Sequence, residues 1–193
     1  MRPSTLAAAI AAGLLALTAC SEPPAPRSAS TTPPPTTASA SPTPSPTPST
    51  PFAMGAKYTW HGEYEGKTLD GHTTVLSYTQ PVQGISGPGE GLGYAHPVWA
   101  VVDIKVCNTK GETITVSRMP WSLSFPDDTR ADASTLSGGD MPKPEFPTLD
   151  TVLKPGDCLR GKVPFIVEKG KRPDRIIYTA GEAEPVEWTV PAK

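Results

Sequence analysis

Residues 98 to 111 read Val-Trp-Ala-Val-Val-Asp-Ile-Lys-Val-Cys-Asn-Thr-Lys-Gly, the strongest secondary-structure signal in the chain. Every second residue from Val98 to Val106 is apolar, while the positions between them mix apolar and polar side chains. A period of two is typical of a β-strand, and the ending Asn-Thr-Lys-Gly is a turn signal. The stretch therefore predicts the long central strand of a sheet.

Shorter segments on both sides repeat this alternation and are separated by Gly, Pro and Asp turns. No segment of three helical turns interrupts them, so helices are not available to cover a parallel sheet. The pattern predicts an all-β fold, an antiparallel β-sandwich of about seven or eight strands. Besides the central strand, the expected strands are 58–60, 75–79, 114–117, 121–125, 159–167, 176–178 and 186–190.

The first nineteen residues read as an export signal. Arg2 is followed by an apolar run from Leu6 to Leu17, which is shorter than the roughly 20 residues that a transmembrane helix needs. Leu17-Thr-Ala-Cys20 then resembles the lipobox of bacterial lipoproteins. This resemblance implies that residues 1–19 are removed and that Cys20 is acylated, which would hold the protein at the extracytoplasmic face of the cell membrane. An ordinary secretory signal with a coincidental cysteine is the alternative.

The next segment has the composition of a linker. Eleven of the 25 prolines fall between Ser21 and Pro51, where the chain has no Phe, Trp, Tyr, Val, Ile or Leu. Such a segment cannot bury enough apolar surface to fold, so residues 20–51 are expected to be a lipidated cysteine and a disordered tether. Residues 52–193 then form one domain, with 15 Lys and Arg against 18 Asp and Glu. A formal charge of −3 argues against nucleic acid as a partner.

Two cysteines, Cys107 and Cys158, remain once Cys20 is assigned to lipid. An even number of cysteines in an exported protein favours a disulfide, with two buried free thiols as the alternative. Cys107 shares its strand face with Asp103 and Lys105, and Cys158 shares its face with charged side chains as well. This parity predicts a link between neighbouring strands rather than a disulfide buried between two sheets.

A resemblance to a known family covers residues 99 to 178. It is carried by the strand that ends in Asn108-Thr109 and by the later pattern Leu-x-Pro-Gly-x-x-x-x-Gly-x-Val-x-Phe, from Leu153 to Phe165. These segments resemble the telokin-like immunoglobulin-fold domain of Gram-positive lipoproteins, which is related to the mycobacterial immunoprotective extracellular protein. The resemblance implies an immunoglobulin-like fold and an envelope location, and it supplies no catalytic residue. Pro164 departs from the pattern, and because proline cannot donate to a ladder, its strand is expected to be bulged or at an edge.

Signals of catalysis and metal binding are weak. The segment Gly84-Ile-Ser-Gly-Pro88 does not complete a nucleophile elbow, and no strand-to-helix unit follows the glycines of this loop. His61, His72 and His96 lack the spacing that lets one element supply two metal ligands. The acidic turn at 127–132 is expected to be solvated, with Arg130 as counter-ion, and the glutamates at 182, 184 and 187 to line a solvated strand face. We therefore expect no enzyme, no cofactor and no metal site.

Two long loops remain, 81–97 and 137–153. Prolines stiffen the second loop around Met141 and Phe146, which we expect to be exposed and to bind a partner. The alternative is that Phe146 and Leu149 cover an open end of the sandwich. The function expected is thus a cell-surface lipoprotein that presents a non-enzymatic immunoglobulin-like module to an envelope protein or polymer. A metal or small-molecule binding protein is the alternative.

Overall fold

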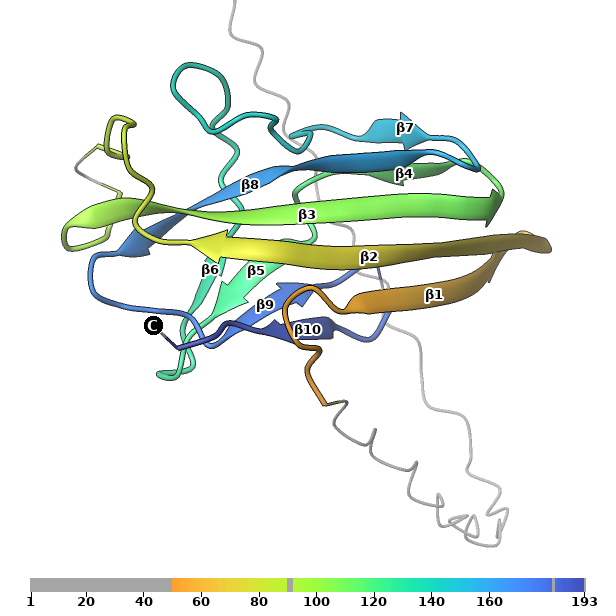
Figure 1. The fold of residues 1–193 in the computed structure, drawn as a ribbon, viewed down its shortest axis with the longest axis horizontal. Coiled ribbons are helices and arrows are strands. Elements are labelled where there is room, and N and C mark those ends of the chain that lie inside the picture. Colours follow the sequence, from red (N-terminus) through yellow and green to blue (C-terminus); the bar gives the residue numbers. More distant parts are fainter. Residues whose placement is uncertain (1–49, 90–91, 182, 193) are drawn as a thin grey trace, which may run out of the picture. The chain divides into compact units, whose positions relative to one another are not determined.

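The protein is described by a computed structural model, which defines residues 50–89, 92–181 and 183–192. Ten strands make up this part of the chain, and it contains no apolar helix of membrane-spanning length (Figure 1). The strands are β1 (Lys57–Tyr64), β2 (Lys67–Thr79), β3 (Pro97–Gly111), β4 (Ile114–Val116), β5 (Trp121–Ser124), β6 (Arg130–Asp132), β7 (Thr151–Leu153), β8 (Cys158–Glu168), β9 (Arg175–Tyr178) and β10 (Val186–Thr189).

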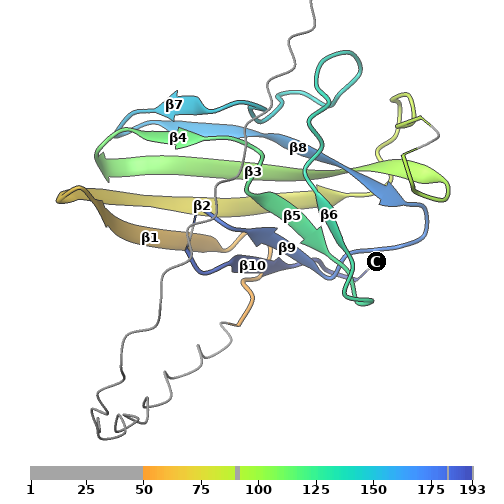
Figure 2. The ribbon, with the colours of Figure 1, turned by 180° about the vertical axis from the view of Figure 1, so that it is seen from behind.

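The strands form a sandwich of two four-stranded sheets. One sheet has the order β1-β2-β3-β8 and the other the order β10-β9-β5-β6, while β4 and β7 make a separate pair (Figures 1 and 2). All of these strand pairs are antiparallel. The prediction of an all-β antiparallel sandwich is confirmed. The three-residue strands β6 and β7 were not predicted.

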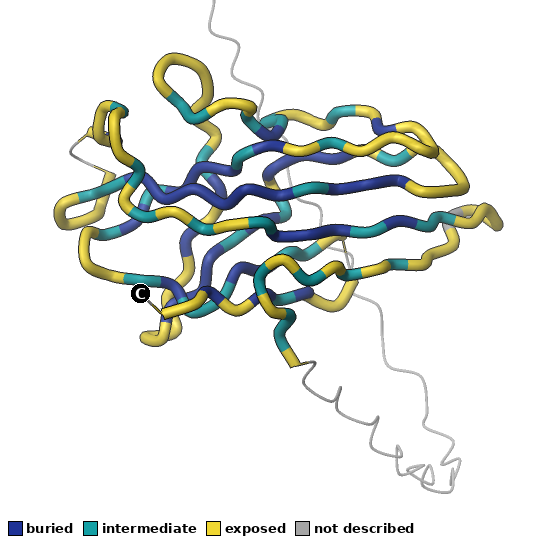
Figure 3. Tube along the Cα trace, viewed as in Figure 1, coloured by how far each residue is buried: buried dark blue, intermediate teal, exposed yellow. Residues whose placement is uncertain are grey.

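The core lies between the sheets and is centred on β3. Ala100, Val102 and Ile104 on its inner face are fully buried, as the alternation predicts. Figure 3 shows the central strand as buried over most of its length. The second sheet contributes Trp121 and Trp188, whose ring centroids lie 5.9 Å apart. The two faces of β3 thus differ: the inner face packs against aromatic side chains of the second sheet, and the outer face combines the buried Trp99 and Val101 with the charged residues Asp103 and Lys105.

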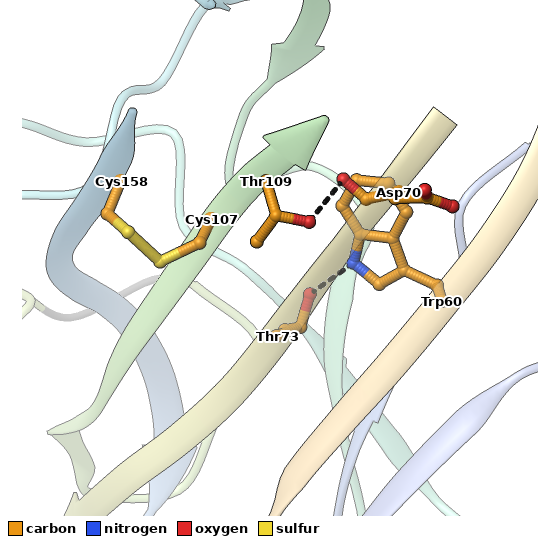
Figure 4. The surroundings of a disulfide bond; sticks show 6 residues. All are labelled: Trp60, Asp70, Thr73, Cys107, Thr109 and Cys158. Atoms are coloured by element: carbon orange, nitrogen blue, oxygen red, sulfur yellow. Dashed lines mark hydrogen bonds between the residues drawn. A yellow bond between two sulfur atoms is a disulfide. The ribbon is translucent and has the colours of Figure 1, made fainter. Parts of the chain in front are cut away.

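A disulfide joins the outer faces of β3 and β8. Cys107 and Cys158 are directly opposite each other in the register, so the bond links neighbouring strands, as the parity predicts (Figure 4). Cys107 is buried and Cys158 is exposed. The bond spans 51 positions of sequence, and a loop of this length contributes about 2–4 kcal/mol to the free energy of unfolding.

Pro164 lies in β8, which is an edge strand of its sheet. Pro164 is the register partner of Val101, and its carbonyl accepts a hydrogen bond from the Ser134 amide at 2.8 Å, on the side away from β3. In an antiparallel pair the N–H and C=O of one residue point to the same side. The missing N–H therefore leaves the β3–β8 ladder intact, and the predicted edge position is confirmed.

Candidate functional site

The two long loops gather at one end of the sandwich. The first joins β2 to β3 and the second joins β6 to β7, and Figures 1 and 2 both place them at the same end. The Ser86 hydroxyl of the first loop donates to the Asp140 carboxylate of the second at 3.3 Å. The first loop is also tied to its sheet, because the Trp99 indole donates to the Ser86 carbonyl at 3.0 Å. We call the described residues 81–89, 92–97 and 133–147 the loop end.

A buried arginine anchors the second loop. Arg118, which is 1% exposed, donates from Nε and Nη2 to the Phe146 carbonyl at 3.1 and 2.7 Å. Its Nη1 donates to the carbonyls of Ser134 and Leu136 at 3.2 and 3.0 Å. One planar guanidinium therefore holds both ends of the loop, which suits the fork geometry of arginine.

The same loop holds an ionised glutamate. Burial opposes the charge of Glu145, but hydrogen bonds from the Lys143 ammonium and the Gly138 amide outweigh it and hold the pKa of Glu145 below its ordinary value. The Glu145 carboxylate also lies 3.4 Å from Arg118 Nη2. Charge-assisted hydrogen bonds and backbone hydrogen bonds thus stabilise the conformation of the loop, in addition to apolar contacts.

Phe146 does not lie where it was predicted. It is fully buried in the core, so the prediction that it is exposed for partner binding is wrong. The cause is a short extension of the sheet: Phe146 donates its amide to the Lys162 carbonyl at 2.9 Å, and the amide of Lys162 donates to Pro144 at 2.8 Å. This pairing on the edge of β8 turns the aromatic ring inward. Leu149, by contrast, is 80% exposed, so the alternative that both residues cover the core holds for Phe146 alone.

Gly161 permits this close approach. A Cβ atom at position 161 would lie only 2.6 Å from the amide nitrogen of Phe146, which is shorter than any normal contact. The glycine in the family-like pattern from Leu153 to Phe165 is therefore explained by the backbone that crosses it, and not by chemistry at a site.

The loop end exposes three large side chains besides Met141, whose role in partner binding stays a prediction. Met141 is half-buried. Leu92 and Tyr94 of the first loop are 45% and 39% exposed, and Leu136 of the second is 52% exposed. No motif marks these three residues in the sequence, although each is a large apolar or aromatic side chain within a glycine- or serine-rich loop.

The histidines do not converge. His61 lies beside Asp70 on the β1–β2 hairpin, with Nδ1 2.8 Å from the carboxylate oxygen, and His72 is the register partner of Cys107. His96 precedes β3 at its other end, roughly 30 Å away at the rise of an extended strand. Within the described residues, no three His, Cys, Asp or Glu side chains are grouped to hold a metal ion.

The acidic turn differs from the prediction in its counter-ion. Asp127 pairs with Lys171 at 3.1 Å, not with Arg130. A hydrogen bond from the Thr129 hydroxyl, followed by one from Lys171, lowers the pKa of Asp127 to about 2. Phe125, Pro126 and Arg172 line an open hollow of about 250 Å³ together with this pair. Lys171 neutralises Asp127, while the Arg172 guanidinium donates to the Pro191 carbonyl and lies 5.2 Å from the centre of the Tyr78 ring. Each charged group of the hollow thus already has a partner in the protein.

Three other predictions concern the ends of the chain. Cys20 and nearly all of the tether lie outside the described residues, as does the glutamate at 182. Glu184 is exposed, as expected. Glu187 is half-buried and pairs with Arg175 at 3.2 Å, so it belongs to an ion pair between β9 and β10.

These features together define an immunoglobulin-like β-sandwich in which hydrogen bonds hold two long loops at one end of the sandwich. The chain belongs to the family described as a domain of unknown function, DUF4352, whose model matches residues 74–185. No curated protein sequence matches it.

Two solved structures are similar to this chain. The secreted protein MPT63 from Mycobacterium tuberculosis is 16% identical with a TM-score of 0.53, over 72% of this chain and 98% of that one. The yjhA protein from Bacillus subtilis is 10% identical with a TM-score of 0.49, over 72% of this chain and 99% of that one. At such identities the likeness to MPT63 extends to the fold alone.

Proposed function

We propose that this protein is a lipid-anchored, extracytoplasmic binding module that contacts a partner in the cell envelope through its loop end and performs no catalysis. The single observation that carries this proposal is that hydrogen bonds hold the β2–β3 loop and the β6–β7 loop in place at one end of the sandwich. Ser86–Asp140 and the Arg118 hydrogen bonds hold them in place, while Leu92, Tyr94 and Leu136 stay exposed. A surface that is ordered before binding loses little conformational entropy when a partner docks.

The location rests on the N-terminal sequence. Leu17-Thr-Ala-Cys20 behind a short apolar run has the layout of a lipoprotein signal, and the similar MPT63 is by its own name a secreted protein. The narrower assignment to the telokin-like domain family is part of this proposal. It is supported by the pattern from Leu153 to Phe165, whose Gly161 and Phe165 occupy buried positions in the sandwich.

A non-enzymatic role is supported by the polar groups of the described residues. The only histidine paired with a carboxylate among them, His61, lies on an exposed hairpin without a hydrogen-bonded serine, threonine or cysteine. A nucleophilic site would need such a side chain within hydrogen-bond reach of the imidazole. The buried Arg118 is occupied by loop carbonyls and by Glu145. The alternative of a metal carrier is not favoured, since His96 lies far from His61 and His72.

The loop end can be tested by substitution. We expect Leu92→Ser combined with Tyr94→Ser to lower capture of a cross-linked envelope partner from intact cells by about tenfold or more, because buried aromatic anchors dominate interface energies. The matched control is Leu149→Ser combined with Val152→Ser, which removes two exposed apolar side chains elsewhere. Equal capture by the two double variants would show that the loop end is not the contact surface.

The anchor can be tested separately. We expect Cys20→Ser to abolish acylation and to prevent cleavage before residue 20, because both steps need the thiol. The measurement is intact mass of the protein recovered from the membrane fraction, compared with the unchanged chain. A variant that loses its signal segment normally and still partitions with membranes would contradict the anchor.

A further inference from the structure

Three cations line up across the outer face of the four-stranded sheet. Lys57 of β1 pairs in register with Thr74 of β2, Thr74 pairs with Lys105 of β3, and Lys105 pairs with Arg160 of β8. Paired residues of antiparallel strands point to the same face. At about 4.8 Å between strands, the row spans roughly 15 Å. We call Lys57, Thr74, Lys105 and Arg160 the basic row.

Only one cation of the basic row is neutralised by the protein. Arg160 donates from Nε and Nη2 to the carboxylate of the buried Asp103 at 3.1 and 2.7 Å. Within the described part of the chain, neither Lys57 nor Lys105 has a carboxylate within 4.0 Å. Two ammonium groups therefore stand uncompensated on either side of Thr74, in a domain whose overall charge is negative.

Burial and the positive charges of Lys57 and Lys105 all affect the pKa of His72. His72 is the register partner of Thr59 on β1 and of Cys107 on β3, one row beyond the basic row and on the same face. Burial lowers the pKa of His72, and the positive charges of Lys57 and then Lys105 lower it further. The charges that face it also include Asp70, two residues along β2 and paired with His61, and Arg160 on β8.

Acidic side chains lie on both sides of the basic row, farther along the strands. On the hairpin side, Glu63 and Asp70 lie on the same outer face, and on the loop-end side Glu168 does. A flat anionic surface such as a bilayer would bring these carboxylates close to its own negative charge. A single narrow chain that crosses the strands along the row meets Lys57 and Lys105, and the carboxylate beside it, that of Asp103, is already paired with Arg160. The arrangement thus favours a linear ligand over a membrane.

We propose that the basic row docks a linear polyanion with repeated phosphate groups, which crosses the sheet perpendicular to the strands and places one phosphate between Lys57 and Lys105, over Thr74. This site lies on the sheet face and not at the loop end, so it goes beyond the function proposed above. Lys57 is exposed and Lys105 is half-buried, which leaves both ammonium groups accessible to a ligand.

The test uses the full mature protein in a neutral detergent and long-chain polyphosphate as the probe. We expect binding to weaken with salt, with a slope of about −1.4 in log affinity against log salt for two lysine–phosphate contacts, because Arg160 is already neutralised by Asp103. Lys57→Gln combined with Lys105→Gln should bring this slope close to zero and weaken binding about tenfold or more at low salt. Lys154→Gln combined with Lys169→Gln removes the same charge from exposed positions outside the row and should change neither.

A spectroscopic readout locates the ligand. A phosphate between the two lysines should raise the pKa of His72, because it offsets the positive charges beside the ring. This shift is measured by NMR titration with and without polyphosphate, while the ring signals of His96 should stay in place. Loop variants Leu92→Ser and Tyr94→Ser should leave polyphosphate binding unchanged, so this proposal and the loop-end proposal fail independently.

Four outcomes would overturn the proposal. These are equal weakening by the two lysine double variants, an unchanged His72 titration at saturating polyphosphate, binding of inorganic phosphate as tight as that of the polymer, and tighter binding to phosphatidylglycerol vesicles than to polyphosphate. The last of these would assign the row to a membrane instead.

Discussion

Phe146→Ala is expected to lower the free energy of unfolding by about 3–5 kcal/mol, the usual cost of deleting a buried phenylalanine ring. Phe146 is fully buried, and its ring lies in the same cluster as Phe165 and Trp121. The substitution leaves a cavity that the surrounding strands cannot fill completely, because the loop backbone is fixed by its pairing with Lys162.

Met141→Ser is the matched comparison for Phe146. It changes a half-buried side chain of the same loop and should cost less than about 1 kcal/mol. Urea denaturation followed by tryptophan fluorescence measures both free energies. Similar small losses for the two variants would mean that Phe146 is not a core residue and that the exposed loop of the sequence-based prediction is correct.

Arg118→Ala is expected to lower the free energy of unfolding as much as Phe146→Ala does, by about 3–5 kcal/mol. This is the cost of breaking a buried charged network by removing one partner, about 3–5 kcal/mol. The alanine leaves the carbonyls of Phe146, Ser134 and Leu136 without their donors. The free energy of unfolding of Arg118→Lys should lie between that of the unchanged protein and that of Arg118→Ala. A lysine keeps the charge but cannot reach partners on several sides with one planar group.

Arg130→Ala provides the control for Arg118, since Arg130 is an exposed arginine on β6. Its substitution should lower the free energy of unfolding by less than about 0.5 kcal/mol. Thermal unfolding gives the ranking of the three variants. Hydrogen exchange at the Phe146 amide adds a local readout, because this amide should exchange faster in Arg118→Ala even under conditions where the domain stays folded. An unchanged exchange rate and melting temperature would show that Arg118 does not fasten the loop.

Local patterns were sufficient to predict the sandwich. The alternation in residues 98–106 gives both the existence of β3 and its inner face, and parity gives the side on which Cys107 and Cys158 meet. Pro164 predicted an edge because proline lacks a donor. The strands β6 and β7 were missed because neither three-residue segment stands out as an alternating run, whereas β4, which is equally short, shortly follows the Asn-Thr-Lys-Gly turn signal of the central strand.

The loop end and the basic row could not be predicted in the same way. Phe146 lies between Pro144 and Pro147, which indicate a loop, and its inward direction depends on pairing with an edge strand distant from it in the sequence. Arg118 is buried because carbonyls from two separate segments surround it. Lys57, Lys105 and Arg160 form a row only through the register of four strands, which no single segment encodes.

The central claim, that the loop end contacts an envelope partner, is tested most directly by photo-cross-linking in living cells. A photoreactive amino acid is placed at position 94 in one strain and, as the comparison, at position 154 in the exposed turn between β7 and β8 at the other end of the sandwich. We predict one discrete cross-linked species at position 94 and none at position 154. The same species at both positions, or at position 154 alone, would contradict the claim.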